Sequence, residues 1–332
     1  MNEVKRFVRR NAAAVVLVAG CVIFGVAAKG FLSLRSFSSL LSQLSIQALL
    51  ATGMLFAMLV GGMDLSVAAT GALAGILAAY SQNWLDMRMG NVPAVLSVLS
   101  AVMVAVVTGI AVGSGIGTLI VRTNIPALVC TLVLMYGIRG LAYAVAGGQP
   151  VVVASKSFSA LGAANLVRFG KMTAGLIPVS LILAVILIIA ARQFLTGTES
   201  GRKICMVGRS RQAAEKAGVN TGKVILAGYM ICSVMASLAG VINTSRFQNG
   251  LPGFMDGYEL YALCAVMLGG VSLRGGKGSV GKVCLGAAAV AVLKNGMDLV
   301  LFPSYWQKII MCALTLGAVV INLRAEEENV YE

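Results

Sequence analysis

Charged residues and histidine are what this 332-residue chain has least of. Asp, Glu, Lys and Arg together make up 11% of the sequence, and histidine is absent. A soluble domain carries about 25% charged residues. So few charges cannot solvate a globule of this size, which excludes a soluble enzyme or binding domain. The lack of histidine argues against a histidine metal site or proton relay, and we expect no metal site.

Disulfide patterns and short alternating strands are missing as well. The seven cysteines form no CxxC pair and lie mostly in apolar runs, where cysteine behaves as a small hydrophobic residue. The apolar runs are continuous and long enough for helices, whereas a membrane barrel shows short alternating segments. The predicted fold class is therefore all-α, a polytopic transmembrane helical bundle that forms a single domain over residues 1–332.

About ten apolar runs follow one another along the chain, which places both termini on the same side of a membrane. Lys and Arg gather in the ends and connections that an N-in, C-in arrangement places inside, including Lys5, Arg6, Arg9, Arg10 and the connection 193–223. The net charge of +14 is spread over many connections, so we expect lipid contacts and no nucleic-acid partner. The runs cover residues 12–32, 41–60, 66–83, 92–112, 125–146, 173–192, 224–243, 258–273, 281–298 and 306–323.

The connection 193–223 contains a charged patch that lies between two apolar runs. Its central part is made of helix-forming residues and ends at a glycine, a common helix stop. The patch contains two alanines, whose small side chains allow another surface to approach, and flanking basic residues that steer an acidic partner. A solvated connecting helix is the alternative. The candidate contact residues are Arg209, Arg211, Gln212, Ala213, Ala214, Glu215 and Gly218.

Asp64 lies between two apolar runs, directly after a pair of glycines. A carboxylate in hydrocarbon costs roughly 2.5–3.5 kcal/mol on insertion scales, so such residues are rare in spans. The glycines permit a break in the helix, which is tolerated only where it is buried in protein or lines a cavity. Asp64 and Ser66 are therefore either a helix cap or, together with Gly61 and Gly62, part of a transport pathway or gate. The position toward the inner side favours the cap.

Glycines recur every four residues at Gly109, Gly113 and Gly117. This spacing gives a helix one smooth face that allows a neighbouring helix to approach closely. We expect the face to pack within the chain rather than at a seam between two copies.

Several motifs match one known family in order and spacing. The charged patch looks like the coupling loop, or "EAA" region, of permease subunits in bacterial ATP-binding-cassette importers. More closely, the chain resembles the ribose-type monosaccharide permeases. Gln212 stands where an acidic residue is common in the family, with Lys216 nearby, so the charges at this contact differ from the pattern. The other matching motifs are residues 61–67, 125–132, 139–142, 147–150, 257–260, 268–273 and 275–278.

The resemblance implies a multi-pass subunit of the bacterial inner membrane that works as a dimer, either with a second copy or with a related permease. It also implies a cytoplasmic ATPase as a separate chain and an extracytoplasmic solute-binding protein. ATP and Mg²⁺ are expected on the ATPase, because residues 271–278 lack the first glycine of a phosphate loop and no cofactor is expected here. The candidates for docking the binding protein, which are equally consistent with a solvated rim, are Gln149, Arg246, Asp256 and Glu259.

The leading functional prediction is the membrane subunit of a monosaccharide importer, for a ribose-, xylose- or galactose-like sugar. Within the family, a nucleoside or a furanosyl signalling molecule is an alternative substrate. An ion-coupled secondary transporter or a channel is the alternative class, with Asp64, Glu259 and Asp298 as the acidic candidates near the spans. An intramembrane enzyme is a third class, but no nucleophile–base set supports it.

Overall fold

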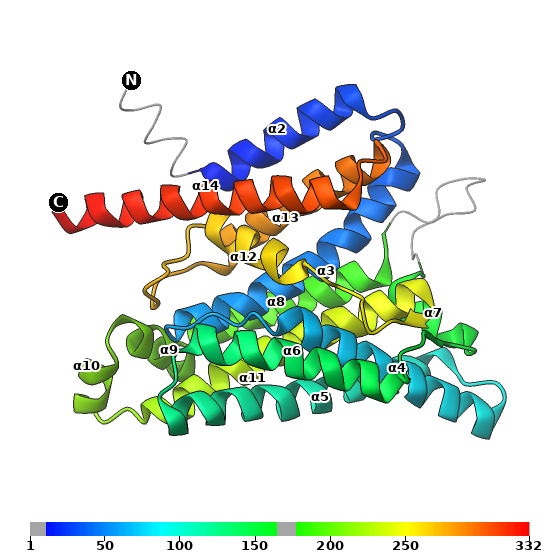
Figure 1. Cartoon of the computed structure of the whole chain (residues 1–332), viewed down its shortest axis with the longest axis horizontal. Coiled ribbons are helices and arrows are strands. Elements are labelled where there is room, and N and C mark those ends of the chain that lie inside the picture. Colours follow the sequence, from blue (N-terminus) through cyan, green and yellow to red (C-terminus); the bar gives the residue numbers. More distant parts are fainter. Residues whose placement is uncertain (1–10, 165–176, 332) are drawn as a thin grey trace.

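The computed structural model describes residues 11–164 and 177–331, and side chains as far as residue 324 (Figure 1). The basic residues from Lys5 to Arg10, used above for orientation, lie outside the described residues. Each of the ten predicted apolar runs overlaps one helix. These helices are α2 (Ala12–Ala27), α3 (Leu34–Leu59), α4 (Val67–Met89), α5 (Ala94–Thr123), α6 (Ala127–Ala146), α8 (Val179–Gly197), α11 (Thr221–Phe247), α12 (Tyr258–Leu268), α13 (Val280–Leu299) and α14 (Ser304–Tyr331).

Seven helices within the described residues are long and apolar enough to cross a membrane. They are α3, α5, α6, α8, α11, α13 and the part of α14 from Ser304 to Arg324. Helices α2 and α12 are apolar but have only 16 and 11 residues, fewer than a helix needs to span the hydrocarbon core of a bilayer. The chain is a polytopic helical membrane protein, as the sequence predicted.

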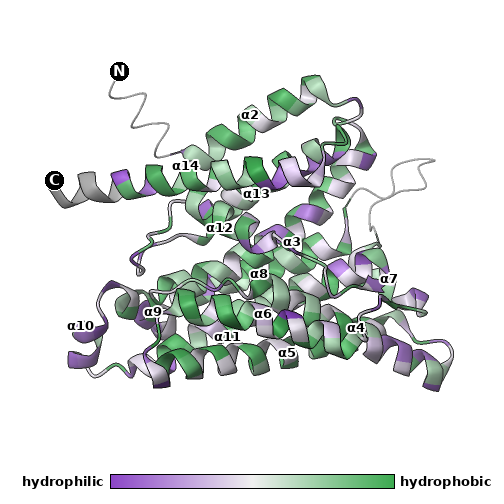
Figure 2. Cartoon of the chain, in the orientation of Figure 1, coloured by the Kyte–Doolittle hydropathy of each residue, from purple (hydrophilic) through white to green (hydrophobic). Residues whose placement is uncertain are grey.

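The helices run roughly along the long axis of the molecule (Figure 1). Helix α3 lies in the middle and contacts α13 on one side and α11 on the other. Helix α2 begins, and α14 ends, toward the end of the molecule that carries α9 (Glu199–Arg209) and α10 (Arg211–Lys216). Hydrophilic residues gather at the two ends of the molecule and hydrophobic residues between them, the distribution that a bilayer demands (Figure 2).

Helix α11 lies in the interior of the bundle, because α3, α4 and α5 all pack against it. The α5 contact depends on the predicted glycine face. A Cβ added at Gly113 would lie 2.7 Å from the Met230 Cα, and one at Gly117 would lie 2.9 Å from the Leu226 Cα. Gly109 meets Val234 in the same way. The expectation that this face packs within the chain is confirmed.

The end of the molecule opposite α9 and α10 carries the short elements. Strand β1 (Val151–Val152) pairs antiparallel with β2 (Asn249–Gly250), so the segment after α6 is tied to the segment after α11. A 3₁₀ turn η1 (Lys156–Phe158) and α7 (Ser159–Gly162) follow β1. The described part of the connection between α6 and α8 therefore forms a small folded structure at this end of the molecule.

Several helices extend well beyond their apolar runs, among them α3, α5 and α14. Helix α3 begins at Leu34, seven residues before the apolar run at residue 41. Ser33 caps this start, because its side chain accepts a hydrogen bond from the Ser36 N–H at 3.2 Å. Helix α5 continues to Thr123 instead of residue 112. Hydropathy reports which residues prefer lipid, whereas helix length is set by caps and by packing along α11, so the two boundaries differ.

Candidate functional site

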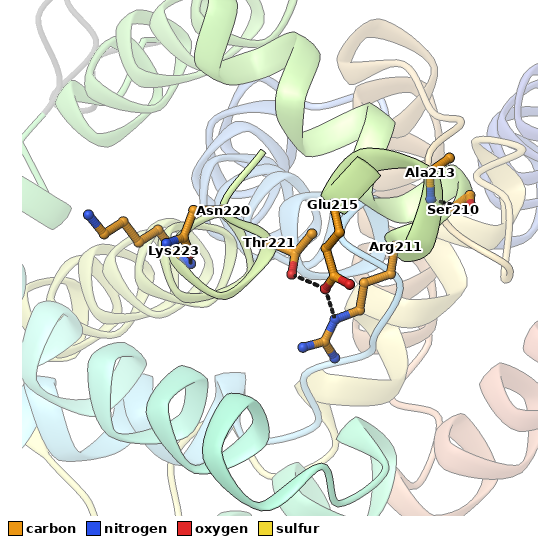
Figure 3. Close-up of polar contacts among 7 residues, drawn as sticks. All are labelled: Ser210, Arg211, Ala213, Glu215, Asn220, Thr221 and Lys223. Atoms are coloured by element: carbon orange, nitrogen blue, oxygen red, sulfur yellow. Dashed lines mark hydrogen bonds and ion pairs between the residues drawn. The ribbon is translucent and has the colours of Figure 1, made fainter. Parts of the chain in front are cut away.

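The charged connection forms two short helices joined at Ser210. Helix α9 begins at the cap Thr198, whose hydroxyl accepts a hydrogen bond from the Gly201 N–H at 3.1 Å. Ser210 ends α9 and caps α10 by accepting from the Ala213 N–H at 3.2 Å (Figure 3). Asn220 then caps α11, because its side-chain oxygen accepts from the Lys223 N–H at 3.0 Å. We call residues 198–220 the coupling segment. The predicted helix with a stop at Gly218 is present, and Gly218 has a left-handed φ of 79°.

Most of the predicted contact residues are free to meet a partner. Arg211, Gln212, Ala213, Glu215 and Gly218 are exposed, as is Arg209. Ala214 is fully buried. The expectation that both alanines offer an approach surface is therefore wrong for Ala214, because the helix turns this residue toward the body of the protein. Ala213 is the alanine that another chain can reach.

Glu215 links the coupling segment to the start of α11. Its Oε1 accepts hydrogen bonds from the Thr221 hydroxyl at 2.7 Å and from the Arg211 Nε at 3.3 Å (Figure 3). These bonds, first that from Thr221 and then that from Arg211, hold the pKa of the Glu215 carboxyl below its usual value. The carboxylate is thus engaged within the chain, so a movement of α10 acts on the first turn of α11.

A second link ties the end of α9 to the end of α3. The Gly276 N–H donates to the Leu59 carbonyl at 3.1 Å, and the Arg209 Nε donates to the Gly276 carbonyl at 3.4 Å. Gly208 lies directly against both the Leu59 carbonyl and the Gly276 nitrogen, with no room for a Cβ. We call this contact between α9, the end of α3 and residues 275–276 the glycine junction.

Gly61 extends the glycine junction toward the predicted gate. A Cβ at Gly275 would lie 2.9 Å from the Gly61 Cα and 3.0 Å from the Gly208 carbonyl oxygen. Gly61 adopts a φ of 92°, which residues with a side chain rarely adopt. The backbone leaves α3 here and reaches Asp64 three residues later. Gly61 is therefore a backbone pivot next to the coupling segment.

Asp64 is fully buried, but the expected helix cap is absent, because no side chain bonds an N–H of the first turn of α4. The Asp64 Oδ1 instead accepts hydrogen bonds from the Ser66 N–H at 2.9 Å and from the Ser66 hydroxyl at 2.6 Å. These two bonds close a local turn that ends directly before α4. The Thr131 hydroxyl of α6 donates to the Met63 carbonyl at 3.1 Å and fixes the same loop from the other side.

The second oxygen of Asp64 has no hydrogen-bond partner among the described residues. Tyr229 of α11 lies nearby, and its hydroxyl also has no partner there. The hydroxyl lies against Gly62, where a Cβ would collide with it and with Ala127. Asp64 interacts electrostatically with Tyr229 and Cys232 of α11 and with Cys130 of α6. Gly62 and Asp64 thus line a buried polar contact with α11, and sequence reasoning missed Tyr229 because one tyrosine in an apolar run carries no motif.

The four docking candidates differ in their surroundings. Gln149 is exposed after α6, and Asp256 is exposed but forms an ion pair with Lys308 at 2.9 Å. Arg246 lines a hollow of about 520 Å³ and donates to the Ser39 hydroxyl at 3.1 Å. The hollow contains Arg35 and three serines of α3 but no acidic residue, so it presents positive charge at this end of the molecule.

Glu259, the fourth candidate for docking the binding protein, is less accessible than the sequence suggested. It is half-buried, and its Oε2 is inaccessible and has no hydrogen-bond partner among the described residues. Arg139 of α6 anchors the connection before α12, because its Nη1 donates to the carbonyls of Pro252 at 2.8 Å and Phe254 at 2.7 Å. Glu259 follows this anchored connection in the first turn of α12.

Comparison with known proteins identifies the family. The family described as "Branched-chain amino acid transport system / permease component" matches residues 36–319. The chain belongs to this permease family. The Ribose import permease protein RbsC of Escherichia coli (strain K12) is 31% identical over 321 residues, which cover 96% of the permease described here and 95% of RbsC.

Two further relatives from the same strain have similar identities. The L-arabinose transport system permease protein AraH is 31% identical over 311 residues, which cover 92% of this permease and 87% of AraH. The Xylose transport system permease protein XylH is 28% identical over 342 residues, which cover 87% and 85%. No solved structure matches the chain. The match extends over nearly the whole length of each protein, so the resemblance covers the spans, the coupling segment and the connections together.

Proposed function

We propose that this protein is the membrane-spanning subunit of an ATP-driven importer for a monosaccharide. The observation that carries the proposal is the coupling segment: an exposed, charged pair of short helices at one end of an apolar bundle, bonded to the start of α11 and packed against the end of α3. The named relatives transport ribose, arabinose and xylose, which favours a pentose or similar sugar. The permease supplies the pathway and holds no ATP site.

The full proposal includes ten crossings with both termini inside the cell. Helices α2, α4 and α12 would bring the seven spans to ten. Helix α4 has 23 residues and is long enough to cross, whereas the shorter α2 and α12 would be accommodated by local thinning of the bilayer and by longer helices beside them. The partners would be a cytoplasmic ATPase at the coupling segment, a binding protein at the opposite end and a second permease subunit. Positive charge around Arg246 suits an acidic surface on the binding protein.

The coupling segment gives a direct test. A photo-crosslinking amino acid at Ala213, in the assembled transporter in membranes, should capture the ATPase. The same amino acid at Gln149, at the opposite end, should capture the binding protein and never the ATPase. Capture of the ATPase from Gln149, or from neither position while uptake remains intact, would refute the proposed arrangement.

An ion-coupled carrier is the second candidate, because the buried carboxylate of Asp64 has no ion-pair partner among the described residues. Sugar uptake into vesicles separates the two classes. An ATP-driven importer takes up sugar only with the ATPase, the binding protein and ATP present. Uptake driven by an ion gradient alone would favour the carrier and reject the importer.

A further inference from the structure

Asp64 and Tyr229 are buried neighbours that each leave one polar atom unbonded. Asp64 is 0% exposed and Tyr229 is 1% exposed. The Asp64 Oδ2 and the Tyr229 hydroxyl both lack a hydrogen-bond partner among the described residues, although the two groups interact electrostatically. A buried polar atom without a partner is costly, so a conformation that brings the two atoms together gains stability. A carboxylate oxygen accepts and a tyrosine hydroxyl donates, so the pair is chemically matched.

Asp64 and Tyr229 are linked to different helices of the coupling segment, Asp64 to α9 and Tyr229 to α10. Asp64 lies three residues beyond Gly61, which belongs to the glycine junction at the end of α9. Tyr229 lies on α11, eight residues or about 12 Å beyond Thr221, the residue that Glu215 of α10 bonds. Because α9 acts on one member of the pair and α10 on the other, a change in the angle between the two short helices changes the separation of the pair.

We propose that Asp64 and Tyr229 form a switch pair: their side chains hydrogen-bond in one transport conformation and separate in the other, and the coupling segment selects between the two. The structure shows the separated form. The proposal rests on the proposed function, since it assigns to these residues the step that links ATP hydrolysis to the pathway. Asp64 and Tyr229 act here as positioning residues and need not touch the sugar.

Four observations limit the alternatives. Asp64 Oδ1 is already bonded to Ser66, so the loop stays folded in either conformation. Gly62 leaves the Tyr229 hydroxyl room to lie against the loop backbone, which a side chain at this position would block. No Lys or Arg is paired with Asp64 in the described residues, so its stable partner has to be a neutral donor. The Cys232 thiol of α11 also interacts with the Asp64 carboxyl as a hydrogen-bond donor, but a thiol is a weak donor and the Tyr229 hydroxyl is the stronger one.

The test uses the assembled transporter in proteoliposomes, with ATP hydrolysis and sugar uptake measured on the same sample. We expect Tyr229→Phe to keep its ATP hydrolysis while the sugar transported per ATP falls about five- to tenfold, the ratio that one lost buried hydrogen bond produces. Tyr136→Phe on α6 removes an exposed hydroxyl and should change neither quantity. Failure of the unaltered protein to show ATP-dependent uptake would refute the proposed function, not the switch pair.

Two further variants distinguish a switch from a structural role. Asp64→Leu should reduce the same ratio, and it also removes the two bonds from Ser66. Adding Tyr229→Phe to Asp64→Leu should cause no further loss, because the bond between the two side chains is already absent. Asp64→Asn keeps one oxygen for Ser66 and offers an amide N–H to the Tyr229 hydroxyl, which can accept it, so this change should restore most of the coupling. Normal coupling in Tyr229→Phe, or losses that multiply in the double variant, would overturn the proposal. So would a parallel loss of folded protein, hydrolysis and uptake in Tyr229→Phe, because that pattern indicates a structural role.

A crosslink keeps the proposal testable where Asp64→Leu fails to fold. Cysteines placed at positions 64 and 229, with Cys130 and Cys232 replaced by alanine, should be joined by a short bifunctional thiol reagent in one nucleotide state of the ATPase and not in the other, since a bond through a tyrosine hydroxyl leaves the two backbones too far apart for a direct disulfide. Equal crosslinking in every nucleotide state, or none in any, would contradict a pair that closes during transport.

Discussion

The contact between α5 and α11 predicts opposite effects for two glycines only two residues apart. At Gly113 an added Cβ would lie 2.7 Å from both the Met230 Cα and the Tyr229 carbonyl oxygen. Contacts between carbon atoms are favourable at about 3.5–4.0 Å, so the two helices would have to separate by about 1 Å. At Gly115 a Cβ would meet nothing within 4 Å. Gly113→Ala therefore overpacks the interface, whereas Gly115→Ala only stiffens an exposed helix position.

The magnitudes follow from these contacts. Overpacking of a close-packed interior costs about 1–3 kcal/mol, and Gly113→Ala also loosens the neighbouring contacts of Gly109 and Gly117. Gly115→Ala should stabilise the helix by about 0.5–1 kcal/mol, because alanine loses less conformational entropy on folding. Reversible unfolding in mixed micelles with increasing SDS measures the difference. Equal effects of the two changes, or a greater loss at Gly115, would refute the packing of α5 on α11.

Two further predictions concern buried and exposed polar contacts. Arg139→Leu should cost about 1–3 kcal/mol, because the carbonyls of Pro252 and Phe254 lose their donor, and it should raise amide hydrogen exchange in residues 251–257; unchanged exchange there would contradict the proposed anchor. The lowered pKa of Glu215 means that its link to Thr221 is fully present above the ordinary glutamate pKa of about 4.3 and is lost as the pH falls through the folded value. The protection of amides at the start of α11, measured relative to the intrinsic exchange rate at each pH, should therefore stay constant from about pH 8 to 5 and fall in more acidic solution. Glu215→Gln should remove this acid-dependent step.

The attachment of the coupling segment suits a part that transmits force. A free connecting helix would move without effect on the bundle, whereas this one is bonded to the start of α11 and lies against the end of α3 without intervening side chains. Backbone contacts between glycines are stiff, because no flexible side chain can absorb the displacement. A displacement of α9 is therefore passed on to Gly61 and the loop that holds Asp64.

Much of the architecture was predictable because it depends on local patterns. Continuous apolar runs indicated the membrane class and overlapped the ten helices, and the run of helix formers before Gly218 indicated the short helix α10. The spacing of Gly109, Gly113 and Gly117 identified a packing face before its partner was known. Each of these signals lies within one segment, where periodicity and composition suffice.

The tertiary structure decided which distant residues meet. Asp64 faces Tyr229 because α3, α4 and α11 pack together, and Glu259 follows a connection that Arg139 on another helix anchors. Ala214 is buried because of the rotation of α10 against the bundle. The contacts of Asp64 with Tyr229 and of Arg139 with Pro252 join segments more than a hundred residues apart, and the burial of Ala214 depends on how α10 packs against α9 and α11. All of them depend on the rotation and neighbours of whole helices, which leave no pattern in any single stretch of sequence.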